Sequence, residues 1–237
     1  MSDRGWGQVR RISERVFEAI DWSLLGDVYF HDDGEQHWRS RLPQVLELGV
    51  GLGERLSAFT RRGGASLWAG AGVAELPAML GEVMVEGRDV VAANLIEVEC
   101  EELNRALAEV APDVALRYRA VDAAVAASER RFDHLGCVSL FTDPERWPML
   151  SGVSYGRIAP VQLDVEAFVA ERERAIALAD ALLSSLELPA VLTTTAEEVG
   201  WFLDRAALRG IEVEAQDELV ETAVVGDPVG FLLLRQA

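Results

Sequence analysis

The chain has 237 residues, 50% of them hydrophobic, and a formal net charge of −18 at pH 7. A surface of this sign repels phosphate backbones and anionic lipid headgroups, which excludes nucleic acid and membrane surfaces as expected partners. No apolar run reaches the roughly 18 residues of a membrane span, and the first residues lack a signal-peptide pattern. All 22 basic residues are arginine, so chemistry that needs a lysine is excluded as well.

The two cysteines, Cys100 and Cys137, lie in apolar stretches. They make neither a disulfide framework nor a metal knuckle, so we expect small buried side chains in a reducing environment. Together with the missing membrane and secretion signals, this predicts a cytoplasmic protein.

The first 62 residues are predicted to form helices that cap the pocket of a second unit, residues 63–237. Apolar side chains recur at helical spacing over residues 8–20. Residues 26–37 are polar and contain an Asp-Gly pair, which predicts a loop with a tight turn. We expect this loop to lie over the pocket as a lid.

Residues 45–53 read Val-Leu-Glu-Leu-Gly-Val-Gly-Leu-Gly and leave two interpretations open. A strand that ends in a glycine-rich turn is one way to hold a nucleotide-like cofactor. However, apolar residues from Leu42 to Phe59 recur every three or four positions, which favours a helix that carries glycines. We therefore predict a helix, with a cofactor loop at Gly49–Gly53 as the alternative.

From residue 63 onward, strand patterns alternate with helix patterns. This alternation predicts an α/β fold with a doubly wound, mostly parallel sheet of seven strands and a C-terminal antiparallel hairpin. The expected strands are 66–69, 89–95, 114–121, 134–141, 190–194, 211–214 extended through 220–225, and 230–235. The expected helices are 76–83, 97–110, 123–130, 165–186 and 197–209.

The segment Ser66–Leu76 is the strongest candidate for a ligand-binding element. It reads as a short buried strand, a glycine turn and the first turn of a helix. Gly70 and Gly72 allow the backbone to turn tightly and to approach a ligand closely. The helix N-terminus near Glu75 would offer free N–H groups. We therefore expect a cofactor cleft at this turn.

Seven strands, helices between the first six and a closing hairpin resemble the class I S-adenosylmethionine-dependent methyltransferase fold, over about residues 63–237. The resemblance implies S-adenosylmethionine as cofactor and methyl transfer as activity. The residues that match the family's glycine motif, and that are implied to face the cofactor, are Gly70, Ala71, Gly72 and Glu75.

Two further family motifs map onto the ends of the next strands. The family's acid that binds the ribose corresponds to Asn94, followed by Leu95, where an amide loses the charge assistance of a carboxylate. The family's acid that contacts the adenine amine corresponds to Asp122, followed by Ala123. The glutamates within 97–102 either substitute for the missing acid or form a solvated helix face.

The candidates for acid–base or acceptor-binding roles are His31, His37, Asp143 and Tyr155, with Arg157 beside the last. A histidine titrates near neutral pH and can serve as a general base. Asp143 follows the fourth expected strand, where the family's substrate loop lies. No further Cys or His supports the two histidines as ligands, so no metal site is expected.

The sequence thus predicts a methyltransferase acting on a small molecule or peptide, and it leaves the oligomeric state open, with a homodimer among the options. One alternative is a non-catalytic relative that keeps the fold as a binding or assembly module, which Asn94 favours. The other is an NAD(P)-dependent oxidoreductase, although the turn lacks the third glycine of that fingerprint.

Overall fold

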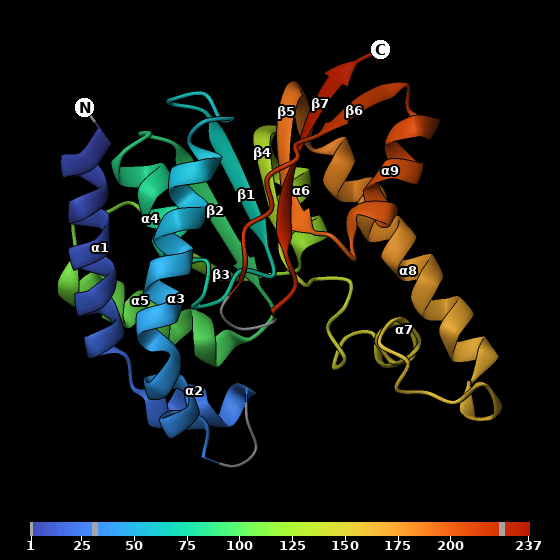
Figure 1. Ribbon diagram of the computed structural model, residues 1–237, viewed down its shortest axis with the longest axis horizontal. Helices are drawn as coiled ribbons and strands as arrows, with labels where there is room; N and C mark the ends of the chain where they lie inside the picture. The colour runs from blue at the N-terminus through green and yellow to red at the C-terminus, as the bar shows by residue number, and fades with distance from the viewer. Residues whose placement is uncertain (1, 30–32, 223–225) are drawn as a thin grey trace.

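A mixed sheet of seven strands crosses the middle of the protein, with helices on both of its faces (Figure 1). The computed structural model describes residues 2–29, 33–222 and 226–237. The strands are β1 (Ala65–Ala69), β2 (Asp89–Asn94), β3 (Tyr118–Ala120), β4 (Phe132–Cys137), β5 (Leu186–Thr195), β6 (Ile211–Ala215) and β7 (Val229–Gln236). The helices are α1 (Ser2–Ala19), α2 (Trp22–Tyr29), α3 (Gly34–Leu56), α4 (Leu76–Met84), α5 (Glu97–Val110), α6 (Ala123–Glu129), α7 (Pro148–Ser154), α8 (Val165–Ser184) and α9 (Val199–Leu208), with a 3-10 turn at Pro160–Gln162.

The strands lie in the order β3-β2-β1-β4-β5-β7-β6. β1 pairs in parallel with β2 and β4, β2 with β3, and β4 with β5. β7 runs antiparallel to both of its neighbours, β5 and β6. The predicted doubly wound, mostly parallel sheet with a C-terminal antiparallel pair is confirmed.

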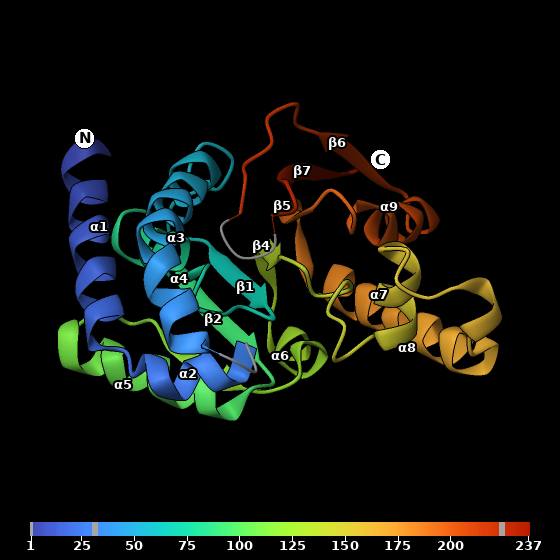
Figure 2. The ribbon, with the colours of Figure 1, turned by 60° about the horizontal axis from the view of Figure 1, so that its bottom comes forward.

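Each face of the sheet carries its own apolar core, because successive side chains of a strand point to opposite faces. Trp68 of β1 packs with the helices α1, α3, α4 and α5, whereas Leu67 and Ala69 pack with α6, α8 and α9. Figure 2 shows the two groups of helices on opposite sides of the sheet. The free cysteines Cys100 and Cys137 are buried in these cores, as expected.

The glycine-rich stretch at 45–53 lies inside α3, so the predicted helix is confirmed and the alternative cofactor loop is not. Gly53 brings α3 close to two other helices. A Cβ at this position would meet the ring of Trp6 at 2.8 Å and Cα of Ala78 at 3.0 Å. Gly53 therefore serves helix packing.

Several predicted boundaries are wrong. Most of the expected loop 26–37 is helical, since α2 reaches Tyr29 and α3 begins at Gly34. The third strand spans only Tyr118–Ala120, at the edge of the sheet. The fourth strand ends at Cys137 rather than at residue 141, because the chain bends at Ser139, which has a φ of 57°.

The expected sixth strand, 211–214 extended through 220–225, is also shorter than predicted. β6 ends at Ala215, and beyond it Val220 makes an isolated bridge with Val229. Positions 223–225 of the predicted extension lie outside the described residues.

The N-terminal helices form an outer layer on α4 and α5 and share one apolar core with that face of the sheet. The boundary between residues 62 and 63 stays a prediction. Across the described ranges, no helix combines the length and apolarity that crossing a membrane requires.

Candidate functional site

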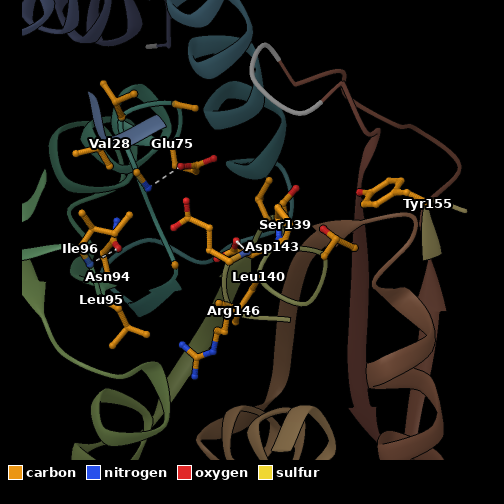
Figure 3. A pocket seen from close by; sticks show the side chains of 18 of the residues that line it. Val28, Glu75, Asn94, Leu95, Ile96, Ser139, Leu140, Asp143, Arg146 and Tyr155 are labelled. Carbon is orange, nitrogen blue, oxygen red and sulfur yellow. Dashed lines mark hydrogen bonds between the residues drawn. The ribbon is translucent and has the colours of Figure 1, made fainter. Parts of the chain in front are cut away.

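A cavity of about 630 Å³ opens at the carboxyl ends of β1, β2 and β4 (Figure 3). From β1 the strand order runs through β2 to β3 on one side, whereas the next strand, β4, lies on the other side of β1. This reversal of strand order is where open α/β sheets bind their ligands. The volume lies within the range of small-molecule sites.

The glycine turn after β1 forms one wall of this cavity. Gly70 has a φ of 74°, a conformation that side chains other than glycine rarely adopt, and its N–H donates to the Ala93 carbonyl at 2.8 Å. A Cβ at Gly70 would also meet Cδ1 of Leu140 at 3.0 Å. The positive φ favours glycine here, as the sequence predicted, and the Leu140 side chain would have to shift to admit a Cβ.

Two carboxylates already accept hydrogen bonds from the turn. The N–H of Gly72 donates to Oε2 of Glu75 at 2.9 Å, and the N–H of Val73 donates to Oε1 of Glu99 at 3.2 Å. Glu75 lines the cavity, and burial raises the pKa of its carboxyl group. The N–H groups of Gly72 and Val73, which precede the helix N-terminus, are therefore already bonded within the protein.

Asn94 lies at the end of β2 and lines the cavity, but its side chain is tied to its surroundings. Its amide nitrogen donates to the Ala71 carbonyl at 3.0 Å and to Oε2 of Glu99 at 2.8 Å, while its Oδ1 accepts from the N–H of Ile96 at 2.9 Å. These bonds fix the glycine turn against α5. Oδ1 keeps a second lone pair for a ligand hydroxyl.

The glutamates of α5 do not all form a solvated face. Glu97 and Glu101 are exposed, but Glu99 and Glu102 are buried. Glu102 accepts from the N–H of Asp21 at 2.6 Å and pairs with Arg105. A buried carboxylate persists where such donors satisfy it, and helical periodicity alone does not reveal them.

The remaining cofactor candidates differ in their positions. Leu95 lines the cavity with a side chain that is 55% exposed, whereas Ala71 and Ala123 are buried and do not line it. Asp122 caps α6 by accepting from the N–H of Ala124 at 2.8 Å, and its other oxygen accepts from Arg146 at 2.9 Å. Arg146 in turn lines the cavity.

These residues suit a nucleoside-bearing cofactor such as S-adenosylmethionine in three respects. The backbone at Gly70 and Gly72 borders the cavity without side chains. Glu75 and Oδ1 of Asn94 are acceptors for ribose hydroxyls or an ammonium group. Leu95 offers an exposed apolar surface to a base.

No protein-family model matches the sequence, and no curated protein matches it. Solved structures do match, 300 chains in all. The chain is similar in structure to methyltransferases.

TrmN from Thermus thermophilus is 17% identical, with a TM-score of 0.48 over 78% of this chain and 48% of that one, so this chain spans about half the length of TrmN. A methyltransferase from Pyrococcus furiosus is 14% identical, with a TM-score of 0.49 over 80% and 83% of the two chains. A ribosomal protein L11 methylase from Lactobacillus delbrueckii subsp. bulgaricus is 13% identical, with a TM-score of 0.46 over 82% and 80%. Likeness at this level concerns the fold and not the activity.

Two of the four catalytic candidates border the cavity. Asp143 lies after β4 and accepts from the N–H of Glu145 at 2.9 Å. The hydroxyl of Tyr155 donates to Oδ2 of Asp227 at 2.7 Å, and burial raises the pKa of this tyrosine. His37 lies on α3 and does not line the cavity, and His31 lies outside the described residues.

Glu198 is a structural determinant of the site that sequence reasoning missed. Its buried carboxylate accepts from the N–H of Phe141 at 2.5 Å and of Thr142 at 3.2 Å, in the bend that lines the cavity after β4. Burial raises its pKa to about 7. Glu198 is 57 residues from Phe141 in sequence, so no local sequence pattern predicts this contact.

Within the described part of the chain, no group of three or more His, Cys, Asp or Glu side chains is placed to hold a metal ion.

Proposed function

We propose that the protein is an S-adenosylmethionine-dependent methyltransferase that acts on a small molecule or peptide. The observation that supports this most is the cavity at the β1–β4 switch point, bordered by a glycine turn in the position that the family resemblance implies. The strongly acidic surface makes nucleic acid the less favoured acceptor. The cytoplasmic location stays a prediction.

The cofactor supplies an electrophilic methyl group when it is bound. In the proposal, the Gly70–Gly72 backbone and the Glu75 and Asn94 oxygens orient it, and Leu95 packs against its base. The contribution of the protein is then alignment of the two reactants and exclusion of water. In the proposal, Asp143, which borders the cavity after β4, takes a proton from the acceptor.

One observation favours a second function, that of a non-catalytic binding protein with the same fold. The two amide hydrogens of Asn94 and the N–H groups of Gly72 and Val73 are already bonded within the protein. In a protein that no longer binds a cofactor, the donors of the former cofactor site would form such bonds within the protein.

Calorimetric titration with S-adenosylmethionine, S-adenosylhomocysteine and NAD separates these functions. We expect micromolar binding of the first two and none of NAD. The variant Gly72→Val should abolish that binding, because its side chain would enter the cavity wall. Gly51→Val is the matched control, since a Cβ at Gly51 meets nothing within 4 Å.

Thermal unfolding of both variants verifies that they are folded. If none of the three ligands binds the wild type, the non-catalytic function replaces the proposal. Binding of NAD alone would indicate an oxidoreductase instead.

A further inference from the structure

We propose that the acceptor carries an anionic group, a carboxylate or a phosphate, and that Arg157 binds it. This inference rests on the proposed function, because it assigns the substrate class of the same cavity. Its basis is the side of the cavity opposite the glycine turn. Tyr155, beside Arg157, lies across the cavity from Glu75 and Asn94 (Figure 3).

Two guanidinium groups border the cavity, and their surroundings differ. Arg146 pairs with Asp122 at 2.9 Å and stacks on the Trp147 ring, at 5.2 Å from its centroid. Arg157 makes no salt bridge with any described residue. Its donors are therefore available to a ligand, whereas those of Arg146 are partly used.

Arg157 is nevertheless held at the cavity. Its Cζ lies 4.8 Å from the centroid of the Tyr155 ring, and the Tyr155 hydroxyl is fixed by its bond to Asp227. The backbone N–H of Arg157 donates to the Gly152 carbonyl at 2.7 Å, which ties it to the end of α7. Stacking on a fixed ring reduces the entropy that the side chain loses on binding a ligand.

The nearby carboxylates form no ion pair with Arg157 within the described ranges, although Asp143 and Glu145 also line the cavity. Asp227 accepts from Tyr155, and Asp143 accepts from the N–H of Glu145. An arginine at a cavity that pairs with no described carboxylate keeps its guanidinium donors for an anion brought by the ligand. The planar guanidinium matches a carboxylate or phosphate with two parallel hydrogen bonds.

The same side of the cavity is apolar near the bend after β4, where Val138 and Leu140 border it. A ligand with an anionic group on an apolar body would bind Arg157 through the anion and pack its apolar part against Val138 and Leu140. We therefore use benzoate, phenyl phosphate and the neutral benzamide as probes, which share a phenyl ring and differ in the group that Arg157 would bind.

The experiment measures binding of the three probes by calorimetry in the presence of S-adenosylhomocysteine. For the wild type, we expect one of the anions to bind about tenfold or more tightly than benzamide, as charge-assisted hydrogen bonds predict. Arg157→Gln should remove this preference. The matched control is Arg15→Gln, which makes the same charge change at an exposed position of α1 that has no ion pair among the described residues.

Equal binding of the anions and benzamide to the wild type overturns the inference, and so does a preference that persists in Arg157→Gln. A preference lost equally in Arg15→Gln also overturns it, because net charge would then be the cause. The titration with S-adenosylhomocysteine alone tests the proposed function separately: an anion site without cofactor binding would contradict that function and leave the anion site standing.

Discussion

Ser139 combines two unfavourable features at the cavity wall. Its φ of 57° places a residue with a side chain in the left-handed region, and its buried hydroxyl has no hydrogen-bond partner within the described ranges. Such features persist where the surrounding structure holds them, and they often mark functional sites. Here the bend that they accompany turns the chain from β4 into the cavity wall.

Ser139→Gly is expected to raise the free energy of unfolding by about 1 kcal/mol, because relief of strain and loss of the unpaired hydroxyl exceed the entropy cost of glycine. Urea denaturation measures the change. Ser139→Ala is the control, since it removes the hydroxyl but keeps the strained Cβ, and it should gain less. A Gly variant less stable than the wild type would contradict this account.

Glu198 is expected to make stability depend on pH. Its pKa is raised from 4.5 to about 7, first of all by burial, so the folded protein holds a proton that the unfolded chain releases. The contribution of Glu198 to stability is therefore full below pH 4.5, falls between pH 4.5 and about 7, and is flat above.

Glu198→Gln removes this titration. The variant should gain stability relative to the wild type by on the order of 1 kcal/mol for each pH unit in that window. Urea denaturation at pH 5, 6, 7 and 8 tests the slope, which is independent of any constant loss from the missing oxygen. A stability difference that does not change with pH would refute the assignment.

At the scale of elements, the three glycines of the α3 motif have different surroundings. Gly49 and Gly53 face other helices, and a Cβ at Gly49 would meet Cγ of Pro77 at 2.9 Å and the Ala74 carbonyl oxygen at 3.0 Å. Gly51, between them, faces open space. Gly49 and Gly53 therefore have a packing role that Gly51 lacks.

Gly49→Ala and Gly53→Ala are each expected to destabilise the protein by about 1–3 kcal/mol, because the added methyl group overpacks the contact between helices. Gly51→Ala should stabilise it by up to about 1 kcal/mol through helix propensity. Thermal unfolding of the three variants measures this contrast. Equal effects at the three positions would show that propensity, not packing, governs α3.

Elements with strong periodicity were predictable from the sequence. α5 begins and ends at the predicted residues, 97 and 110, and α3 was distinguished from a cofactor loop by its apolar spacing. Strand ends were less predictable. The apolar run through Phe141 gave no sign that β4 ends at Cys137, because Leu140 and Phe141 are buried outside the sheet, Leu140 in the cavity wall.

The candidate site was predictable where it depends on local backbone geometry. The glycine turn lies as predicted because its signal is contained within a few residues. The roles of Asn94 and Asp122 were not predictable, since a polar residue after a strand serves equally as a ligand contact or a cap. Arg157 was a candidate by sequence, but only the positions of the neighbouring carboxylates show that it pairs with none of those in the described ranges.

For the molecule as a whole, the net charge of −18 destabilises the folded state through repulsion between like charges, and local ion pairs offset part of this effect. Ion pairs whose two side chains are both exposed, such as Arg10–Glu47, Arg39–Glu35 and Arg235–Glu214, contribute little each. We therefore expect the midpoint of thermal unfolding at pH 7 to rise as NaCl shortens the Debye length from roughly 30 Å to roughly 8 Å. The rise should shrink near pH 4.5, the sequence pI, and a midpoint that falls with salt at pH 7 would contradict this view.

The antiparallel strand β7 has a consequence for biosynthesis. It lies between β5 and β6, so until residues 229–236 have left the ribosome β5 lacks a partner along one edge and β6 has no partner strand in the sheet. A nascent chain that stalls before Val229 would display an unpaired, apolar β5 edge, which is a template for association with other chains. The sheet is thus complete only once β7 has paired, and protection of the β5 edge by a chaperone matters most just before that.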